Sequence, residues 1–155
     1  MNAMIHRFGL LTLAAALLLL TAGCGKAKPS VYDAAKGGNP AKVKEALDKG
    51  ADPNEKDKDG RTLLHLAALT GRIPMARLLI EHGADVNSQT FEGITPLYIA
   101  AFKDNAAMAE LLIQHGADVN AQESKSGHSP LDMAKSDKMK SLLTNHGAKH
   151  GNELK

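Results

Sequence analysis

Three histidines recur at nearly equal intervals along the chain, and they are the first residues that suggest chemistry. His82, His115 and His146 each stand directly before a glycine, at intervals of 33 and 31 residues. Imidazole nitrogens are common zinc ligands, so histidines brought together from neighbouring segments would suit a metal site. The end of a helix is an equally good place for a histidine, where it bonds a free carbonyl group and interacts with the helix dipole. We expect this structural role and no bound metal.

Three carboxylates recur as well. Asp52, Asp85 and Asp118 follow Gly-Ala at an interval of 33 residues, and carboxylates brought close together can serve acid–base catalysis. Asp in such a string is also a common turn residue, which is the role that we expect here. The sequence holds no G-x-S-x-G, P-loop or H-E-x-x-H string. We therefore expect a protein that is not an enzyme and that has no catalytic residues and no cofactor.

Cys24 is the only cysteine, so it makes neither an internal disulfide nor a thiolate zinc site by itself. A short start that ends at Arg7 precedes a run of 15 apolar, small or Thr residues, 8–22. This pattern is typical of an export signal. The run is shorter than the roughly 20 apolar residues that a helix needs to span a bilayer.

The stretch Thr21-Ala22-Gly23-Cys24 resembles a bacterial lipobox, although Thr21 stands where that family usually has Leu. The resemblance implies cleavage before Cys24 and lipidation of this cysteine, and several acyl chains give stable membrane anchoring. Gly25, in place of Asp, favours the outer membrane of a bacterial cell envelope, with the protein facing the periplasm. An incidental thiol in an ordinary cleaved signal and an uncleaved anchor remain alternatives.

These observations divide the start of the chain into a signal peptide, 1–23, and a lipidated cysteine with its tether, 24–30. The five tether residues 26–30 span at most about 18 Å when extended. We therefore expect the protein to act close to the bilayer.

The rest of the chain is built from repeats. Gly-Ala-Asp begins at Gly50, Gly83 and Gly116, and GRTLLHLAA at Gly60 returns as GITPLYIAA 33 residues later. A related string, GHSPLDMA, begins at Gly127, one residue late. These strings resemble ankyrin repeats, whose period is about 33 residues. The resemblance covers 31–148 and implies an all-α solenoid of about four helix-turn-helix units with hairpin loops.

Local residue choices agree with this architecture. Pro96 suits the first position of a helix. Gly71 suits a helix end with a left-handed backbone, and Asp104 holds the same place in the next unit. His65 lies in the slot that the resemblance assigns to a hydrogen bond with the hydroxyl of Thr62. Residues 149–155 form a polar tail that we expect to fray.

Charge and family resemblance together define the kind of partner. The chain has 19 Lys and Arg against 17 Asp and Glu, without the basic stripe of a nucleic-acid binder. We expect a monomer that binds no nucleic acid and reaches the membrane through its lipid. The resemblance implies a protein partner, bound by hairpin tips and the ends of the first helices. On this sequence those positions are Lys58, Asp59, Arg61, Leu69, Phe91, Glu92, Ile94, Phe102 and Lys103.

The third unit holds most of the aromatic residues. After residue 23 the chain has four, and Phe91, Tyr98 and Phe102 lie in this unit. Exposed aromatics often anchor interfaces, so Phe91 and Phe102 are the expected anchors. The alternative is that Phe102 folds inward and Phe91 packs on the base of its hairpin.

The resulting hypothesis is a lipid-anchored periplasmic module that binds another protein. Similar bacterial proteins suggest an immunity protein that neutralises a toxin in the periplasm, or a helper of an exported enzyme such as a catalase. Two further hypotheses stay open at this point, namely a hydrolase or metal-binding activity and a passive envelope protein.

Overall fold

The computed structural model describes residues 30–35 and 38–154. All regular structure in these ranges is helical, with eight α-helices and one short 3₁₀ helix. None of the described helices is long and apolar enough to cross a membrane. Cys24 and the signal-peptide residues lie outside these ranges, so the expectations about cleavage and lipid stay predictions.

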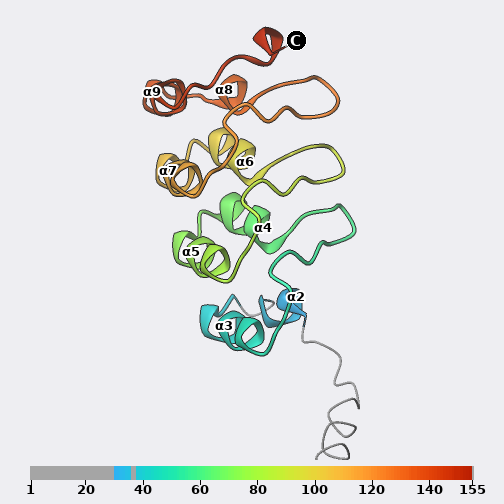
Figure 1. The fold of residues 1–155 in the computed structure, drawn as a ribbon. Coiled ribbons are helices and arrows are strands. Elements are labelled where there is room, and N and C mark those ends of the chain that lie inside the picture. The colour runs from blue at the N-terminus through green and yellow to red at the C-terminus, as the bar shows by residue number, and fades with distance from the viewer. Residues whose placement is uncertain (1–29, 36–37, 155) are drawn as a thin grey trace, which may run out of the picture.

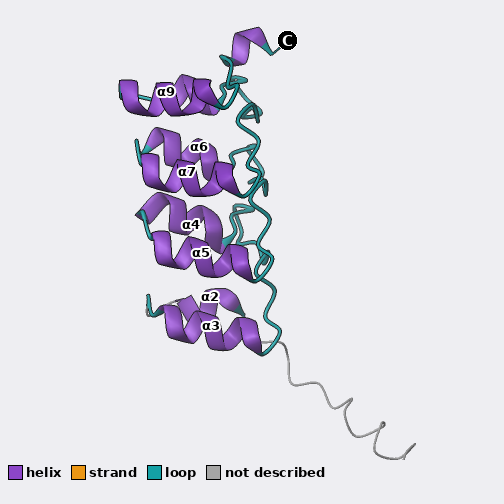
Figure 2. Cartoon of the chain, turned by 60° about the vertical axis from the view of Figure 1, so that its left-hand side comes forward, coloured by secondary structure: helices purple, strands orange, loops and turns teal. Residues whose placement is uncertain are grey.

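The eight helices form four pairs that stack one on another (Figure 1). The first helix of each pair, which we call the inner helix, lies in one layer, and the second, the outer helix, lies in another (Figure 1). The loops between the pairs run along one side of the stack (Figure 2). The all-α solenoid of four units is thereby confirmed. The pairs, which we call the first to fourth repeats, are α2 (Val31–Ala35) and α3 (Pro40–Asp48), α4 (Leu63–Thr70) and α5 (Ile73–Glu81), α6 (Pro96–Phe102) and α7 (Ala106–Gln114), and α8 (Pro130–Met133) and α9 (Asp137–Asn145).

The helices begin and end where local backbone preferences dictate. Pro96 opens α6, where its missing N–H costs no helical bond. The hydroxyl of Thr95, the residue before it, accepts the N–H of Tyr98 at 3.2 Å. Gly71 caps the end of α4 with φ 68°, and Asp104 adopts φ 57° at the matching place after α6. The shared left-handed conformation of Gly71 and Asp104 is confirmed.

The core runs without interruption through all four repeats. Ala68 and Ala100 are fully buried, and such small side chains let neighbouring inner helices approach closely. A single helix pair cannot bury its apolar face alone, so each repeat depends on the next for stability. The large apolar side chains that are fully buried include Leu64, Leu79, Leu97, Met108, Leu112, Met139 and Leu143.

An asparagine after each Gly-Ala-Asp turn joins one repeat to the next. The Asn54 side-chain amide donates to the Gly83 carbonyl oxygen at 3.1 Å, and its oxygen accepts the Asp85 N–H at 2.7 Å. The same pair of bonds recurs one and two repeats later, at Asn87 and Asn120. These repeated asparagine bonds, which we call the asparagine ladder, provide partners for backbone groups just after the outer helices. Such groups have no partner within the helix itself.

Replacing Asn87 by Ala is expected to lower the free energy of unfolding by about 1 kcal/mol, because two backbone groups of the next repeat lose their partner. Urea denaturation followed by circular dichroism measures the change. Gln89→Ala is the matched control, since Gln89 is exposed in the same loop and its side chain makes no hydrogen bond among the described residues. Equal stability of the two variants would contradict the role of the ladder.

His65 is a buried link between the second and third repeats. It is fully buried, and its Nδ1 accepts the Thr62 N–H at 3.1 Å and lies 2.9 Å from the Thr62 hydroxyl. Because a backbone N–H can only donate, the ring proton is on Nε2, which donates to the Ile94 carbonyl oxygen at 3.0 Å. The contact with the Thr62 hydroxyl is the one implied by the resemblance. The bond to Ile94 reaches the following repeat.

A side chain from the loop that follows α3 closes the start of the first repeat. The Glu55 carboxylate accepts the Ser30 hydroxyl at 2.8 Å and the Val31 N–H at 3.0 Å. An anion at this place satisfies a free N–H group and interacts favourably with the start of α2.

The C-terminal tail packs against the fourth repeat, so the expectation that it frays is wrong for the described residues. Gly151–Glu153 forms the 3₁₀ helix η1, and Gly151 is buried. The Gly151 N–H donates to Asp132 at 2.8 Å, and the Gln122 amide donates to the carbonyl oxygens of Gly127 and Gly151 at 2.8 Å each. The expectation failed because Asp132, in the slot that His65 holds earlier, supplies an acceptor for the tail.

Candidate functional site

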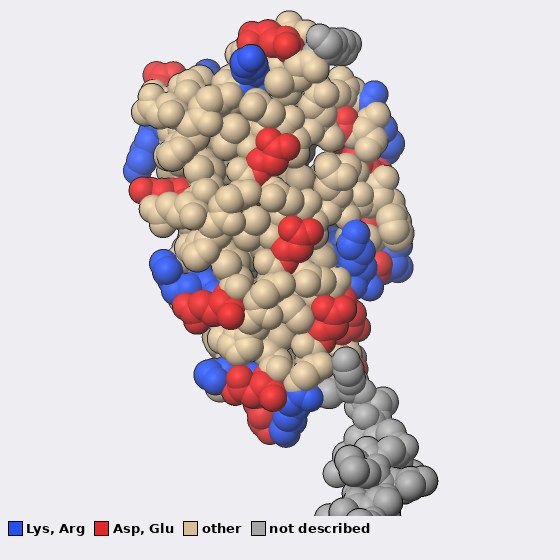
Figure 3. Space-filling model, viewed as in Figure 1, with Lys and Arg blue, Asp and Glu red and all other residues tan. Residues whose placement is uncertain are grey.

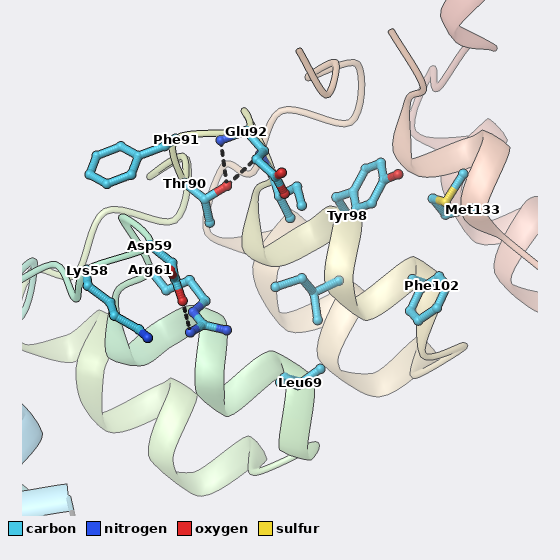
Figure 4. A pocket seen from close by; sticks show the side chains of 12 residues that line it. Lys58, Asp59, Arg61, Leu69, Thr90, Phe91, Glu92, Tyr98, Phe102 and Met133 are labelled. Carbon is cyan, nitrogen blue, oxygen red and sulfur yellow. Dashed lines mark hydrogen bonds and ion pairs between the residues drawn. The ribbon is translucent and has the colours of Figure 1, made fainter. Parts of the chain in front are cut away.

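A groove of about 610 Å³ runs from the second to the fourth repeat, on the side of the inner helices (Figure 4). Two successive hairpins form one of its sides. Thr90 shapes the second hairpin, because its hydroxyl accepts the N–H groups of Glu92 and Ile94 at 3.3 and 3.2 Å. The other hairpin residues that line the groove are Lys58, Asp59, Arg61, Phe91, Glu92 and Ile94.

Side chains from three inner helices form the remainder of the lining. They are apolar except for the hydroxyl of Tyr98, which lies beside Met133 in Figure 4. Burial, reinforced by the negative charges of Glu123 and Asp132, raises the pKa of Tyr98. Its hydroxyl therefore stays neutral at physiological pH and can donate a hydrogen bond. The helix residues are Leu69 from α4, Tyr98, Ile99 and Phe102 from α6, and Met133 from α8.

The exposed large apolar side chains of the described chain gather in this groove. Leu69 is 40% exposed, Phe91 75% and Phe102 47%, and all three line it. Covering such side chains with a partner removes apolar surface from water, which favours association. Exposed apolar side chains that line one groove often mark an interaction site.

The Phe91 ring packs partly on the preceding hairpin but remains largely exposed to solvent. A side chain added at Gly60 would lie 3.0 Å from the Phe91 ring, so one edge of the ring packs on the preceding hairpin. The Phe91 N–H donates to the Asp59 carbonyl oxygen at 3.3 Å, which fixes one hairpin on the other. The ring nevertheless remains three-quarters exposed. Local packing therefore leaves the outer face of the ring free, and its contact with a partner stays a prediction.

Phe102 is the last residue of α6 and does not fold inward. Its ring is about half exposed, and the Lys135 ammonium group lies 4.7 Å from the ring centroid. This distance is typical of a cation–π interaction, which contributes about 0.5–1 kcal/mol at an exposed site. The interaction also places a positive charge directly beside the apolar lining.

The carboxylates on the groove rim are already engaged in ion pairs. Arg61 binds Asp57 at 3.1 Å and also binds Asp59. Glu92 pairs with Lys125 of the next hairpin. These exposed pairs add little stability, and only the Glu92–Lys125 pair joins two hairpins.

A family model of three ankyrin repeats matches residues 31–123 and 88–153. These two matches together cover the four stacked repeats. The chain belongs to the ankyrin-repeat family. No curated protein matches it. Ankyrin repeats form protein-interaction modules that are typically not enzymes, and this domain is a module of that class.

The ankyrin fold brings most of the expected binding residues into one place. Eight of the nine line the groove, and Lys103 stands next to Phe102 but outside the lining. That they contact a partner stays a prediction. Sequence reasoning missed Thr90, Tyr98, Ile99 and Met133. Ile99 and Met133 hold the repeat position of Leu66, and this recurrence of an apolar residue was the signal that could have identified them.

Of the three recurring histidines of the ankyrin domain, His82 has the structural role that we expected. His82 Nδ1 lies 2.9 Å from the Leu78 carbonyl oxygen, and Nε2 lies 3.1 Å from Asp48. These two bonds raise the pKa of His82. The rings of His115 and His146 make no such bonds among the described residues. Within the described ranges, no group of three or more His, Cys, Asp or Glu side chains could hold a metal ion.

The carboxylate row has the turn role that we expected. Asp52, Asp85 and Asp118 each accept the N–H of the residue two places later, at 2.8, 2.9 and 2.8 Å. All three are exposed. Figure 3 shows acidic side chains one above another along the middle of the face in view, with basic side chains towards its edges.

Proposed function

We propose that this ankyrin domain binds one protein partner through the groove while a lipid on Cys24 holds it at a bacterial membrane. The observation that carries the proposal is the gathering of Leu69, Phe91 and Phe102 in one groove. Truncating a central aromatic residue typically costs more than the area of contact suggests, because such residues act as hot spots. The domain then serves as a monomeric binding module.

The anchor is supported by the sequence around Cys24. A short apolar run, small residues before the cysteine and a polar tether after it suit lipidation after export. Gly25 favours the outer membrane, with the ankyrin domain in the periplasm. Within this setting the partner is an incoming toxin that the domain neutralises, or an exported enzyme that it supports. The identity of the captured partner distinguishes these two roles.

Phe91→Ala and Phe102→Ala are each expected to weaken partner binding by more than about 1 kcal/mol. Each substitution removes an exposed ring and should change stability little. The partner is first captured from envelope extracts with tagged protein, and its affinity for each variant is then measured by calorimetry. Glu110→Ala, exposed on the outer helix α7, is the control and should bind as the unchanged protein does. Large destabilisation with unchanged affinity of the folded fraction would contradict the proposal.

Cys24→Ser is expected to abolish lipidation and to release the protein from the membrane fraction. Mass spectrometry of the purified protein detects the acyl chains, and fractionation of inner and outer membranes tests the sorting inferred from Gly25. This single substitution should release the protein because the acyl chains on Cys24 supply its affinity for the membrane. An unmodified Cys24 in the unchanged protein, or equal fractionation of both forms, would contradict the anchor while leaving the groove proposal intact.

A further inference from the structure

Cations without a carboxylate partner flank the groove. Lys58 lines it on the hairpin side, and Lys135 lies over Phe102 at the other end. Lys103, next to Phe102, is exposed as well. None of the three forms an ion pair within the described part of the chain.

Two of the carboxylates near the groove are, by contrast, held in ion pairs, and a third accepts hydrogen bonds. Asp59 is bound by Arg61, and Glu92 by Lys125. Asp104, beyond the end of α6, accepts the hydroxyl of Ser136 at 2.8 Å and its N–H at 3.2 Å. Asp104 keeps its negative charge, because these donors are neutral groups. Lysines nevertheless outnumber it among the side chains without an ion pair, with Lys58 at one end of the groove and Lys103 and Lys135 at the other.

This imbalance constrains what can dock on the apolar lining. Water solvates an exposed lysine, and a partner that covers the lysine removes this water, which costs free energy. A carboxylate on the partner compensates that loss, whereas a basic partner adds repulsion to it. The position of Lys135 over Phe102 places such a carboxylate within a few ångström of the surface that an apolar side chain would cover.

We propose that the groove takes an acidic segment of the partner protein. Apolar side chains of this segment contact Phe91 at one end of the groove and Phe102 at the other (Figure 4), and flanking carboxylates contact Lys58 and Lys135. The inference rests on the proposed protein-binding function and specifies its chemistry. Selectivity then arises from charge at the ends and affinity from the apolar centre.

The test is a selection of random peptides, displayed on phage, against the full-length protein. Enriched peptides are expected to carry Asp or Glu close to an aromatic residue or Leu. A synthetic copy of the most enriched peptide, labelled with fluorescein, should bind Lys58→Glu/Lys135→Glu at least about tenfold more weakly than the unchanged protein. Its affinity should also fall as salt concentration rises.

A matched control separates the groove from overall charge. Lys42→Glu/Lys140→Glu changes the net charge by the same amount on the outer helices α3 and α9, where both lysines are exposed, and should bind the peptide nearly as the unchanged protein does. Enrichment of basic or neutral peptides whose binding is lost in Phe91→Ala/Phe102→Ala would contradict the proposed acidity of the partner and support binding in the groove. Equal loss in the two charge variants would also overturn it. A selection without any peptide that depends on Phe91 and Phe102 would overturn both the inference and the proposed function.

Discussion

Replacing His65 by Ala is expected to lower the free energy of unfolding by about 3 kcal/mol. The ring is fully buried and bonds Thr62 and Ile94, so the substitution leaves a cavity and removes the partner of the Thr62 N–H. The Ile94 carbonyl oxygen keeps the Thr90 N–H as its donor. Each buried group left without a partner costs about 1–3 kcal/mol, and the cavity adds to this cost. Urea denaturation of the two proteins measures the difference.

The control for this prediction is His115→Ala. His115 is exposed after α7, and its ring makes no hydrogen bond among the described residues, so its removal should stay within about 0.5 kcal/mol of the unchanged protein. If His65→Ala is as stable as His115→Ala, the buried hydrogen-bond link does not stabilise the stack.

The pH dependence of stability provides a second measurement on the same residue. Burial lowers the pKa of His65, while hydrogen bonds to Ile94 and Ser88 oppose this change. The unfolded chain therefore binds a proton more readily at this position than the folded chain does. His65 therefore lowers the free energy of unfolding as the pH falls below 6.5, the ordinary pKa of a histidine side chain. This loss of stability should be absent from His65→Ala.

Replacing Gly151 by Ala is expected to lower the free energy of unfolding by about 2 kcal/mol, as overpacking in a tight site does. A Cβ at Gly151 would lie 1.9 Å from the Gly127 carbonyl oxygen and 3.1 Å from the Asp132 carboxylate. The tail must then move away and release the bond from its N–H to Asp132. Faster amide hydrogen exchange in α8, together with a lower unfolding temperature, would report this loosening.

Asn152→Ala is the control for Gly151, since Asn152 is the next residue in the same turn and is exposed. Its exchange rates and unfolding temperature should match those of the unchanged protein. Gly151→Ala with the same exchange rates in α8 would show that the tail does not cap the last repeat.

The Asp132 carboxylate shows what the tail adds to the fourth repeat. Burial of this group opposes its ionisation. Hydrogen bonds from Ser129, Gly151 and His150 outweigh this effect and lower its pKa to about 2. The tail thus supplies two of the three residues that hold the negative charge. Terminal repeats of a solenoid need such a cap, because no further repeat covers them.

Some residues of the groove could be predicted from the sequence, and others could not. The hairpin tips and helix ends, including Phe91 and Phe102, could be placed because they hold fixed positions in a 33-residue period. Tyr98 could not, because it enters the groove only through the stacking of α6 and α8, which brings it beside Met133 (Figure 4). Lys135 is likewise far from Phe102 in sequence, and the cation–π contact depends on how the fourth repeat sits on the third.

The sequence by itself determined the repeat architecture of this protein. Pro96, Gly71 and Asp104 act through their own backbone preferences, and those preferences do not depend on distant contacts. Only the tertiary structure decided which groups meet across repeats, such as His65 with Ile94 and the tail with Asp132. The physical reason is that these contacts depend on the packing of one unit against the next, which no local pattern records.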